Sequence, residues 1–297
     1  MIPVVRHFAK VRRAATRIVA HAAVIRPALR CAPKALSRVD RCRPLMIEFR
    51  QVFKRFGAAI ALDGFSATTG NDWTCIGVLG RNGAGKSTLL RILVGMLSAT
   101  SGRIAVRRQT QCWPFAGAAL ATFVPEQTAV VPTLTGKQYL CLHETMSRLI
   151  GVATDARLRE RLVMELDVGA HLDKLCRRMS KGNRRKVELI AALSADVPLV
   201  VADELTDALD VPSWLQLQGI IRAITAAGRK LVIASHDLSF LADVCDRIWV
   251  IDHGRLVDEL AVGAISLTEL RARVASSFGI SLSGDDDSHA CSRDRGT

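Results

Sequence analysis

Residues 80–87, with the sequence GRNGAGKS, constrain this chain more than any other segment. They match the pattern GxxxxGK[ST], follow the apolar run Thr74–Leu79 and open a helical pattern at Lys86, a context that a chance Gly-rich turn does not require. Glycines in such a loop let successive backbone N–H groups turn toward an anion, and the helix N-terminus adds its positive end. The segment therefore predicts a nucleotide phosphate site, with Lys86 at the β- and γ-phosphates and Ser87 on Mg²⁺. The residues that we expect to bind ATP here are Gly80, Arg81, Asn82, Gly83, Ala84, Gly85, Lys86, Ser87 and Thr88.

The rest of the chain alternates strand-length apolar runs with helical patterns. Three runs are apolar throughout, which is typical of a parallel sheet covered by helices on both faces. These runs are Thr74–Leu79, Pro198–Ala202 and Lys230–Ala234, and the helical patterns after them are Lys86–Leu97, Pro212–Ala227 and Asp237–Cys245. Two earlier strands, Met46–Val52 and Ala61–Ser66, flank a Gly-containing turn, and residues from Thr135 to Arg178 carry helical spacing only. The fold class is therefore α/β.

Two adjacent carboxylates, Asp203 and Glu204, end the apolar run Leu199–Ala202. Neighbouring strand residues face opposite ways, so one acid can face Mg²⁺ while the next, at the strand end, faces a water molecule. We assign Asp203 to the metal and Glu204 to general base or water-positioning work. An acidic pair after an apolar run is weak evidence alone, since it could cap a helix. The acidic pair becomes informative because a phosphate loop lies upstream, and together the two features indicate a P-loop NTPase.

The segment Met179–Asn183, MSKGN, resembles the signature motif of ABC ATPases, usually LSGGQ. The order of phosphate loop, signature, carboxylate strand, D-loop Asp210 and switch histidine His236 is that of the family and covers residues 46 to 275. The resemblance implies a P-loop NTPase core with a parallel sheet, an antiparallel β subdomain, and a helical signature lobe inserted at about residues 135–182. It also places Phe56 where the family has an aromatic that stacks on adenine; an ordinary core aromatic is the alternative.

The resemblance further implies a head-to-tail dimer that sandwiches two ATP molecules. The signature residues of one subunit would contact the γ-phosphate held by the other, and they are Ser180, Lys181, Gly182 and Asn183. His236 would contact the γ-phosphate bound in its own subunit, and Asp210 would link the two ATP sites. Losing the γ-phosphate would then let the dimer open. We expect a homodimer, or a heterodimer with another ABC ATPase subunit, and a separate transmembrane permease at the cytoplasmic face of the membrane.

Several positions depart from the family pattern. Glu126 stands where the Q-loop glutamine is expected to touch Mg²⁺, with Gln127 next to it, so either residue could fill that place. Lys181 replaces a glycine and Asn183 a glutamine in the signature. We expect a variant signature that still functions rather than a degenerate one, because the serine and the second glycine remain. Leu205 replaces the usual proline and removes no reactive group.

The charge distribution argues against a nucleic-acid-binding protein, and the cysteine spacing argues against a metal site or a disulfide framework. Of the net charge of +13, residues 1–45 carry +10, which leaves +3 for the remaining 252 residues and gives the body no footprint for nucleic acid. We expect residues 1–45 to be a basic, disordered extension that is dispensable or artefactual, with a targeting segment or membrane-surface contact as alternatives, and residues 276–297 to be a disordered tail. The eight cysteines show no metal spacing and are expected to be reduced.

The function that follows is an ATP-hydrolysing subunit that powers a transporter, with export favoured by the signature and by the lack of a long C-terminal regulatory domain. The alternative is a non-transport ABC ATPase. A DNA-associated member would need long coiled-coil arms, but only 94 residues separate Lys86 from Ser180. A ribosome-associated member would carry two nucleotide domains, and a module that only binds ATP is opposed by the presence of both Glu204 and His236.

Overall fold

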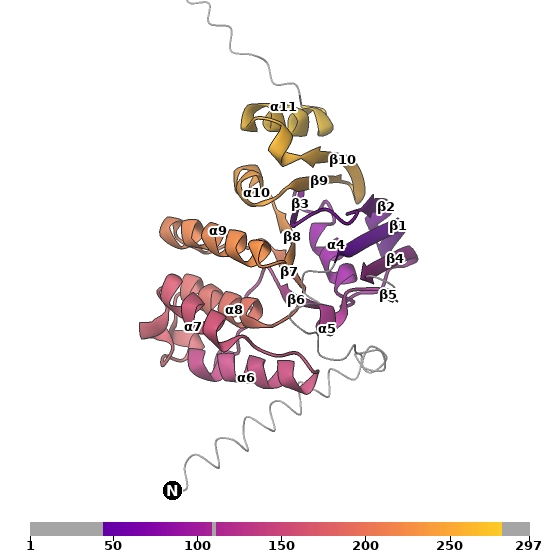
Figure 1. Cartoon of the computed structure of the whole chain (residues 1–297). Helices are drawn as coiled ribbons and strands as arrows, with labels where there is room; N and C mark the ends of the chain where they lie inside the picture. The colour runs from indigo at the N-terminus through magenta and orange to yellow at the C-terminus, as the bar shows by residue number, and fades with distance from the viewer. Residues whose placement is uncertain (1–43, 109–110, 281–297) are drawn as a thin grey trace, which may run out of the picture.

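The computed structural model describes residues 44–108 and 111–280, which fold into two sheets and their covering helices (Figure 1). The predicted extension at 1–45 lies almost wholly outside the described residues, as does most of the predicted tail at 276–297. The last described helix, α11 (Leu267–Ser277), continues two residues into that predicted tail. None of the described helices is long and apolar enough to cross a membrane.

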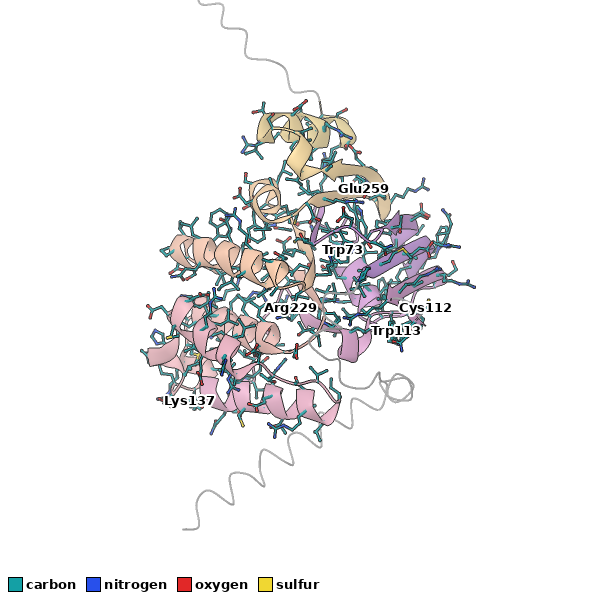
Figure 2. All side chains as sticks on the ribbon, viewed as in Figure 1. Trp73, Cys112, Trp113, Lys137, Arg229 and Glu259 are labelled. Carbon is teal, nitrogen blue, oxygen red and sulfur yellow. The ribbon has the colours of Figure 1, made fainter. Side chains whose placement is uncertain are left out.

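One sheet is antiparallel and has the strand order β2-β1-β4-β5. Its strands are β1 (Leu45–Phe56), β2 (Ala59–Thr68), β4 (Ser101–Arg108) and β5 (Gln111–Trp113). This sheet is the predicted antiparallel subdomain. Only its first two strands, β1 and β2, are predicted from the sequence; β4 and β5 are not. Trp73, labelled in Figure 2, fixes the sheet to the segment that leads into the core, because its buried indole N–H donates to the Leu45 carbonyl at 2.7 Å.

The second sheet has the order β10-β9-β3-β8-β7-β6, with every neighbouring pair parallel except β10 and β9. Its strands are β3 (Cys75–Gly80), β6 (Ala121–Val124), β7 (Leu199–Asp203), β8 (Lys230–Ser235), β9 (Arg247–Asp252) and β10 (Arg255–Ala261). Strands β3 and β7 are buried along their whole length and β8 along all but its first residue, as continuous apolar runs predict.

Helices cover both faces of the parallel sheet. The helix α4 (Lys86–Leu93) packs between the two sheets, where Leu89, Leu90 and Ile92 share a buried cluster with strand residues of both. On the other face lie α8 (Lys181–Ser194), α9 (Val211–Ala226) and α10 (Leu238–Val244). The apolar residues of these three helices pack together in a second buried cluster. The α/β class and the main predicted helices are confirmed, although α4 ends before the predicted Leu97, with Gly95 in a left-handed conformation.

The predicted helical lobe consists of α6 (Gly136–Leu149), α7 (Ala156–Glu165) and the start of α8, and Figure 1 shows it as a separate group below the sheet. Short 3-10 turns, Gly169–His171 and Cys176–Arg178, connect α7 to α8. The helix α5 (Gly117–Leu120) precedes β6, and the turn Val262–Ala264 precedes α11. The lobe therefore enters the chain between strands β6 and β7, which are neighbours in the sheet.

Strand order decides which residues meet. The parallel register pairs Leu79 of β3 with Ser235 of β8, and Ala234 of β8 with Asp203 of β7. The carboxyl ends of these three strands therefore lie side by side, and the residues that follow them share one edge of the sheet. In open α/β sheets this edge is where ligands bind.

Candidate functional site

The phosphate loop joins β3 to α4 in a conformation that leaves helix amides available to an anion. Gly85 is the N-cap of α4 with φ 104°, and no side chain caps the first turn, which also holds no acidic residue. A Cβ at Gly85 would lie 2.4 Å from the Ala61 carbonyl oxygen, so only glycine fits there. Uncapped N–H groups at a helix start are a ready site for phosphate.

The other loop residues lie around this start. Arg81, Asn82 and Gly83 are exposed, and Ala84 is buried beneath them. The Arg81 guanidinium lies 5.2 Å from the ring centroid of Phe278 at the end of α11, a contact between distant segments that sequence spacing does not predict. Ser87 and Thr88, in the first turn of α4, are half-buried.

Lys86, Glu204 and His236 converge at the edge of the sheet. The buried Lys86 ammonium donates to the Gly80 carbonyl at 2.8 Å and lies 3.8 Å from Oε1 of Glu204. The other oxygen of Glu204 accepts from the Ser235 hydroxyl at 3.1 Å and lies 3.0 Å from Nδ1 of His236. The Glu204 side chain is 11% exposed, whereas the His236 side chain is 72% exposed. A single carboxylate thus lies between the phosphate-loop cation and the histidine predicted to contact the γ-phosphate.

Glu204 also has a strained backbone. Its φ is +48°, a left-handed conformation that costs free energy for a residue with a side chain and is often found at functional sites. Its N–H donates to the Ala234 carbonyl at 2.9 Å, which holds the conformation in place. Leu205, in the usual place of proline, is 1% exposed and packs in the core, so burial rather than a rigid ring fixes the turn here.

Asp203 is a buried carboxylate with unmet bonding capacity. It is 1% exposed, and neither of its oxygens has a hydrogen-bond partner of normal geometry. Burial raises its pKa above the usual value, the Ser87 hydroxyl opposes the rise, and the charges of Glu126 and Glu204 add to it. Such a group suits a cation.

The residues present fit a Mg²⁺ ion of the kind that binds together with a nucleotide. No group of three or more His, Cys, Asp or Glu side chains within residues 44–108 and 111–280 could hold a metal by itself. Mg²⁺ does not need one, because it usually takes one or two carboxylates, and phosphate oxygens and water supply the remaining ligands. The Ser87 hydroxyl lowers the pKa of Asp203 by hydrogen bonding and the charge of Glu126 raises it, so both groups lie near the Asp203 carboxylate. The side chains of Glu126 and Gln127 are both exposed.

The signature begins helix α8. Ser180 is its N-cap, and the exposed Ser180 hydroxyl accepts from the Asn183 N–H at 3.1 Å. Within the described residues no hydrogen bond or ion pair joins positions 180–183 to the phosphate loop of the same chain. The Lys181 ammonium lies 2.9 Å from Asp207 in the segment after Glu204, so its charge is engaged within the chain.

Asp210 caps a helix, whereas the ring of Phe56 is exposed at the end of a strand. Asp210 is the N-cap of α9, and hydrogen bonding from Ser213 lowers its pKa, so the predicted D-loop residue has a helix-capping role in one chain. Phe56 is 51% exposed at the end of β1, with the Lys54 ammonium 4.9 Å from its ring centroid. That exposure is evidence against an ordinary core aromatic.

One residue of the site escaped the sequence analysis. Arg185, on the core-facing side of α8, is 2% exposed and donates to the carbonyls of Asp203 and Glu204. The sequence carried only part of the signal: Arg185 and Glu188 stand three residues apart in a helix, and Glu188 lies between Val187 and Leu189, but Arg185 lies between Arg184 and Lys186. A charged pair at that spacing can be buried only if it is paired.

Similarity to known proteins identifies the family of the domain that carries this site. A family profile described as ABC transporter matches residues 66–207, a segment that contains the phosphate loop, the signature and the two carboxylates. The chain carries an ABC transporter ATP-binding domain. A solved structure described as the ATP binding subunit of an ABC transporter matches this domain with a TM-score of 0.65 at 21% identity, over 77% of this chain and 99% of that one.

Relatives of this ABC domain include import proteins. The arabinose import ATP-binding protein AraG of Azospirillum brasilense is 34% identical over 188 residues, which are 61% of this chain and 36% of AraG. The ribose import ATP-binding protein RbsA of Burkholderia mallei is 31% identical over 238 residues, 76% of this chain and 47% of RbsA. The chain thus spans less than half the length of both relatives.

The expected export direction finds no support in these relatives, whose names specify import. A bacterial exporter structure with ATP bound does match the fold, with a TM-score of 0.66 at 22% identity over 84% of this chain and 43% of that one. Likeness at that identity shows the fold alone. The expectation rested on the signature motif, whose predicted partner is ATP, and a motif with that role carries no information on the direction of transport.

Proposed function

We propose that this chain binds and hydrolyses ATP as a head-to-tail dimer and powers a transporter through a separate transmembrane subunit. The observation that carries the proposal is the position of the Glu204 carboxylate, 3.8 Å from the Lys86 ammonium and 3.0 Å from Nδ1 of His236, beside a loop of uncapped helix amides. A phosphate site, a cation and a base at one sheet edge are the parts that phosphoryl transfer to water needs.

The roles of the side chains follow from their places. The amides of α4 and Lys86 bind the β- and γ-phosphates, and the Glu204 carboxylate accepts the proton of the attacking water. Asp203, Ser87 and Glu126 would hold Mg²⁺, which, when bound, neutralises charge on the β- and γ-phosphate oxygens. The exposed His236 and Phe56 are available to the γ-phosphate and the adenine ring. Exposure of Ser180 leaves it free to contact the phosphate of a second copy.

Import is the direction that we propose, because the relatives of this chain are named for arabinose and ribose import. Uptake of radiolabelled arabinose and ribose by cells of the source organism, with the wild-type chain or Glu204→Gln, tests this. Loss of uptake of either sugar in the variant supports import. Unchanged uptake of both, with faster outward release in the wild type, contradicts it.

The decisive enzymatic test compares ATP hydrolysis by the wild-type chain and Glu204→Gln. We expect the turnover rate to fall by about 10²- to 10⁴-fold, the usual contribution of a general base, with ATP binding retained. Glu259→Gln is the matched control, because Glu259 lies on the edge strand β10 in an exposed ion pair with Arg247. Equal hydrolysis by wild type and Glu204→Gln would show that Glu204 is not the base.

Light scattering of Glu204→Gln tests the dimer. Saturating ATP and Mg²⁺ should double the mass of the slow variant, and ADP should not, because the γ-phosphate bridges the subunits. A variant that stays monomeric in MgATP with its membrane partner supplied would refute the in-trans role of Ser180.

A further inference from the structure

A buried arginine in the signature helix contacts two segments outside that helix. Arg185 is 2% exposed, and its Nη2 donates to the carbonyls of Asp203 at 3.1 Å and Glu204 at 2.8 Å. Its Nη1 donates to Glu188 at 3.0 Å and to the carbonyl of Pro125, the residue before Glu126. One guanidinium therefore joins α8 to the end of β7 and to the segment after β6.

Glu188 completes the connection from the other side. It is 4% exposed, and its Oε1 accepts from the Ala129 N–H at 2.7 Å, while Oε2 accepts from the Thr128 hydroxyl at 3.2 Å. The pair thus bonds to the chain on both sides of positions 126 and 127. The two candidate Q-loop residues are held between a carbonyl fixed by Arg185 and an amide fixed by Glu188.

Stability alone does not account for this pair. A buried ion pair is often no more stabilising than apolar side chains of similar volume, because both charges lose their hydration. Arg185 and Glu188 are instead hydrogen-bonded to the end of β7 and to the segment after β6, which carry the proposed metal ligands. A planar guanidinium offers donors in a fixed fork, which sets the spacing of the carbonyls that it joins.

We propose that Arg185 is a positioning residue that sets the spacing between the segment carrying Glu126 and the carboxylates Asp203 and Glu204; the inference rests on the proposed function. Because Arg185 lies five residues after Ser180 on the same helix, movement of the signature helix shifts both strand ends together. The Mg²⁺ site and the catalytic base are thereby coupled to the surface that meets the second copy.

The test measures nucleotide binding with and without Mg²⁺, using a fluorescent ATP analogue in EDTA and then in Mg²⁺. Arg185→Gln should bind the analogue in EDTA like wild type, because the phosphate loop is intact. The gain in affinity on adding Mg²⁺ should fall by about 10- to 100-fold, the usual effect of removing a group that orients metal ligands. We expect kcat to fall as well, and KM for MgATP to rise with the loss of Mg²⁺-dependent affinity. Arg185→Lys should recover part of both losses, since an ammonium keeps the charge but not the fork.

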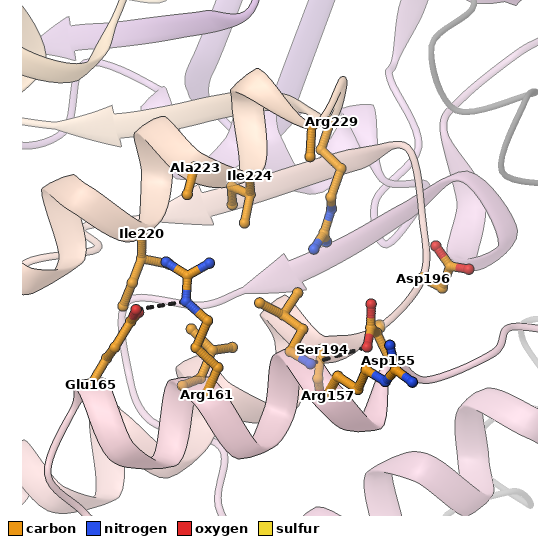
Figure 3. A pocket seen from close by; sticks show the side chains of 14 residues that line it. Asp155, Arg157, Arg161, Glu165, Ser194, Asp196, Ile220, Ala223, Ile224 and Arg229 are labelled. Atoms are coloured by element: carbon orange, nitrogen blue, oxygen red, sulfur yellow. Dashed lines mark hydrogen bonds and ion pairs between the residues drawn. The ribbon is translucent and has the colours of Figure 1, made fainter.

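Arg229→Gln is the matched control for loss of a buried arginine. Arg229 is 5% exposed and donates to the Leu193 carbonyl near the far end of α8. It lines a cavity of about 310 Å³ between α7 and α9, where Figure 3 shows it with Arg161 and Asp155 and without any residue of the phosphate site. Its loss should lower Tm and leave the Mg²⁺ dependence as in wild type.

The outcomes separate the inference from the proposed function. An Arg185→Gln chain whose Mg²⁺ gain and kcat match those of Arg229→Gln would overturn the positioning role. If Arg185→Gln does not fold, Arg185→Lys decides in the same assay, and full Mg²⁺ gain and kcat in that variant would overturn the need for the fork. A wild-type chain that gains affinity from Mg²⁺ but never hydrolyses ATP would refute the proposed function while the binding assay still tested Arg185.

Discussion

Replacing Asp203 by Asn should stabilise the metal-free protein and abolish its response to Mg²⁺. Both Asp203 oxygens are buried without a hydrogen-bond partner of normal geometry, the Ser87 hydroxyl offsets the burial only in part, and Glu126 and Glu204 add negative charge nearby. A buried charged group without a partner costs about 1–3 kcal/mol or more. Because Asn keeps polar atoms that also lack partners, we expect a net gain on the order of 1 kcal/mol at neutral pH. That gain corresponds to about 2–4 °C in Tm for a domain of this size.

The pH dependence gives the sign of the effect. The folded-state pKa of Asp203 is raised, so the folded protein holds the proton more tightly than the unfolded chain does. The destabilisation by the charged form is therefore present above the folded pKa and is lost as pH falls through it. The stability difference between Asp203→Asn and wild type should shrink on acidification.

Thermal unfolding monitored by circular dichroism checks both expectations, first in EDTA at neutral and acidic pH and then with Mg²⁺ and a non-hydrolysable ATP analogue. Mg²⁺ with the analogue should raise Tm of the wild type more than the analogue in EDTA does, and the variant should show no such difference. A variant less stable than wild type in EDTA at neutral pH, or equally stabilised by Mg²⁺, would refute our account of Asp203.

Two further substitutions test the loop and the adenine contact. Gly85→Ala should prevent binding of the fluorescent analogue and lower Tm, because the new Cβ would meet the Ala61 carbonyl at 2.4 Å in addition to strain of about 1–3 kcal/mol at φ 104°. Gly83→Ala, where a Cβ meets no atom within 4 Å, should cost only the strain, and an equal loss in both variants would contradict the steric argument. Phe56→Ala should weaken ATP binding by about 1–3 kcal/mol, the usual value of a base stacked on an aromatic ring. Its Tm should stay near wild type because the ring is 51% exposed, and unchanged affinity in a titration would exclude Phe56 from the adenine site.

Local features of this protein could be predicted from the sequence because they depend on consecutive residues. The phosphate loop is one: its glycines, its lysine and the helix after it are neighbours in the chain, and their chemistry needs no distant partner. The buried strands are another, since an unbroken apolar run such as Leu199–Ala202 has few alternatives to the interior of a parallel sheet. The α/β class and the ABC resemblance followed from these features.

The tertiary structure decided what distant residues do to one another. Glu204 lies beside Lys86 and His236 because β3, β8 and β7 are neighbours in a sheet order that differs from their order in the chain. The same packing buries Arg185 and pairs Lys181 with Asp207, and neither outcome follows from helical spacing. Burial, pairing and strain depend on sheet register and on what covers each face. A sequence can therefore name the reactive groups, but only the packed fold sets their distances and charges.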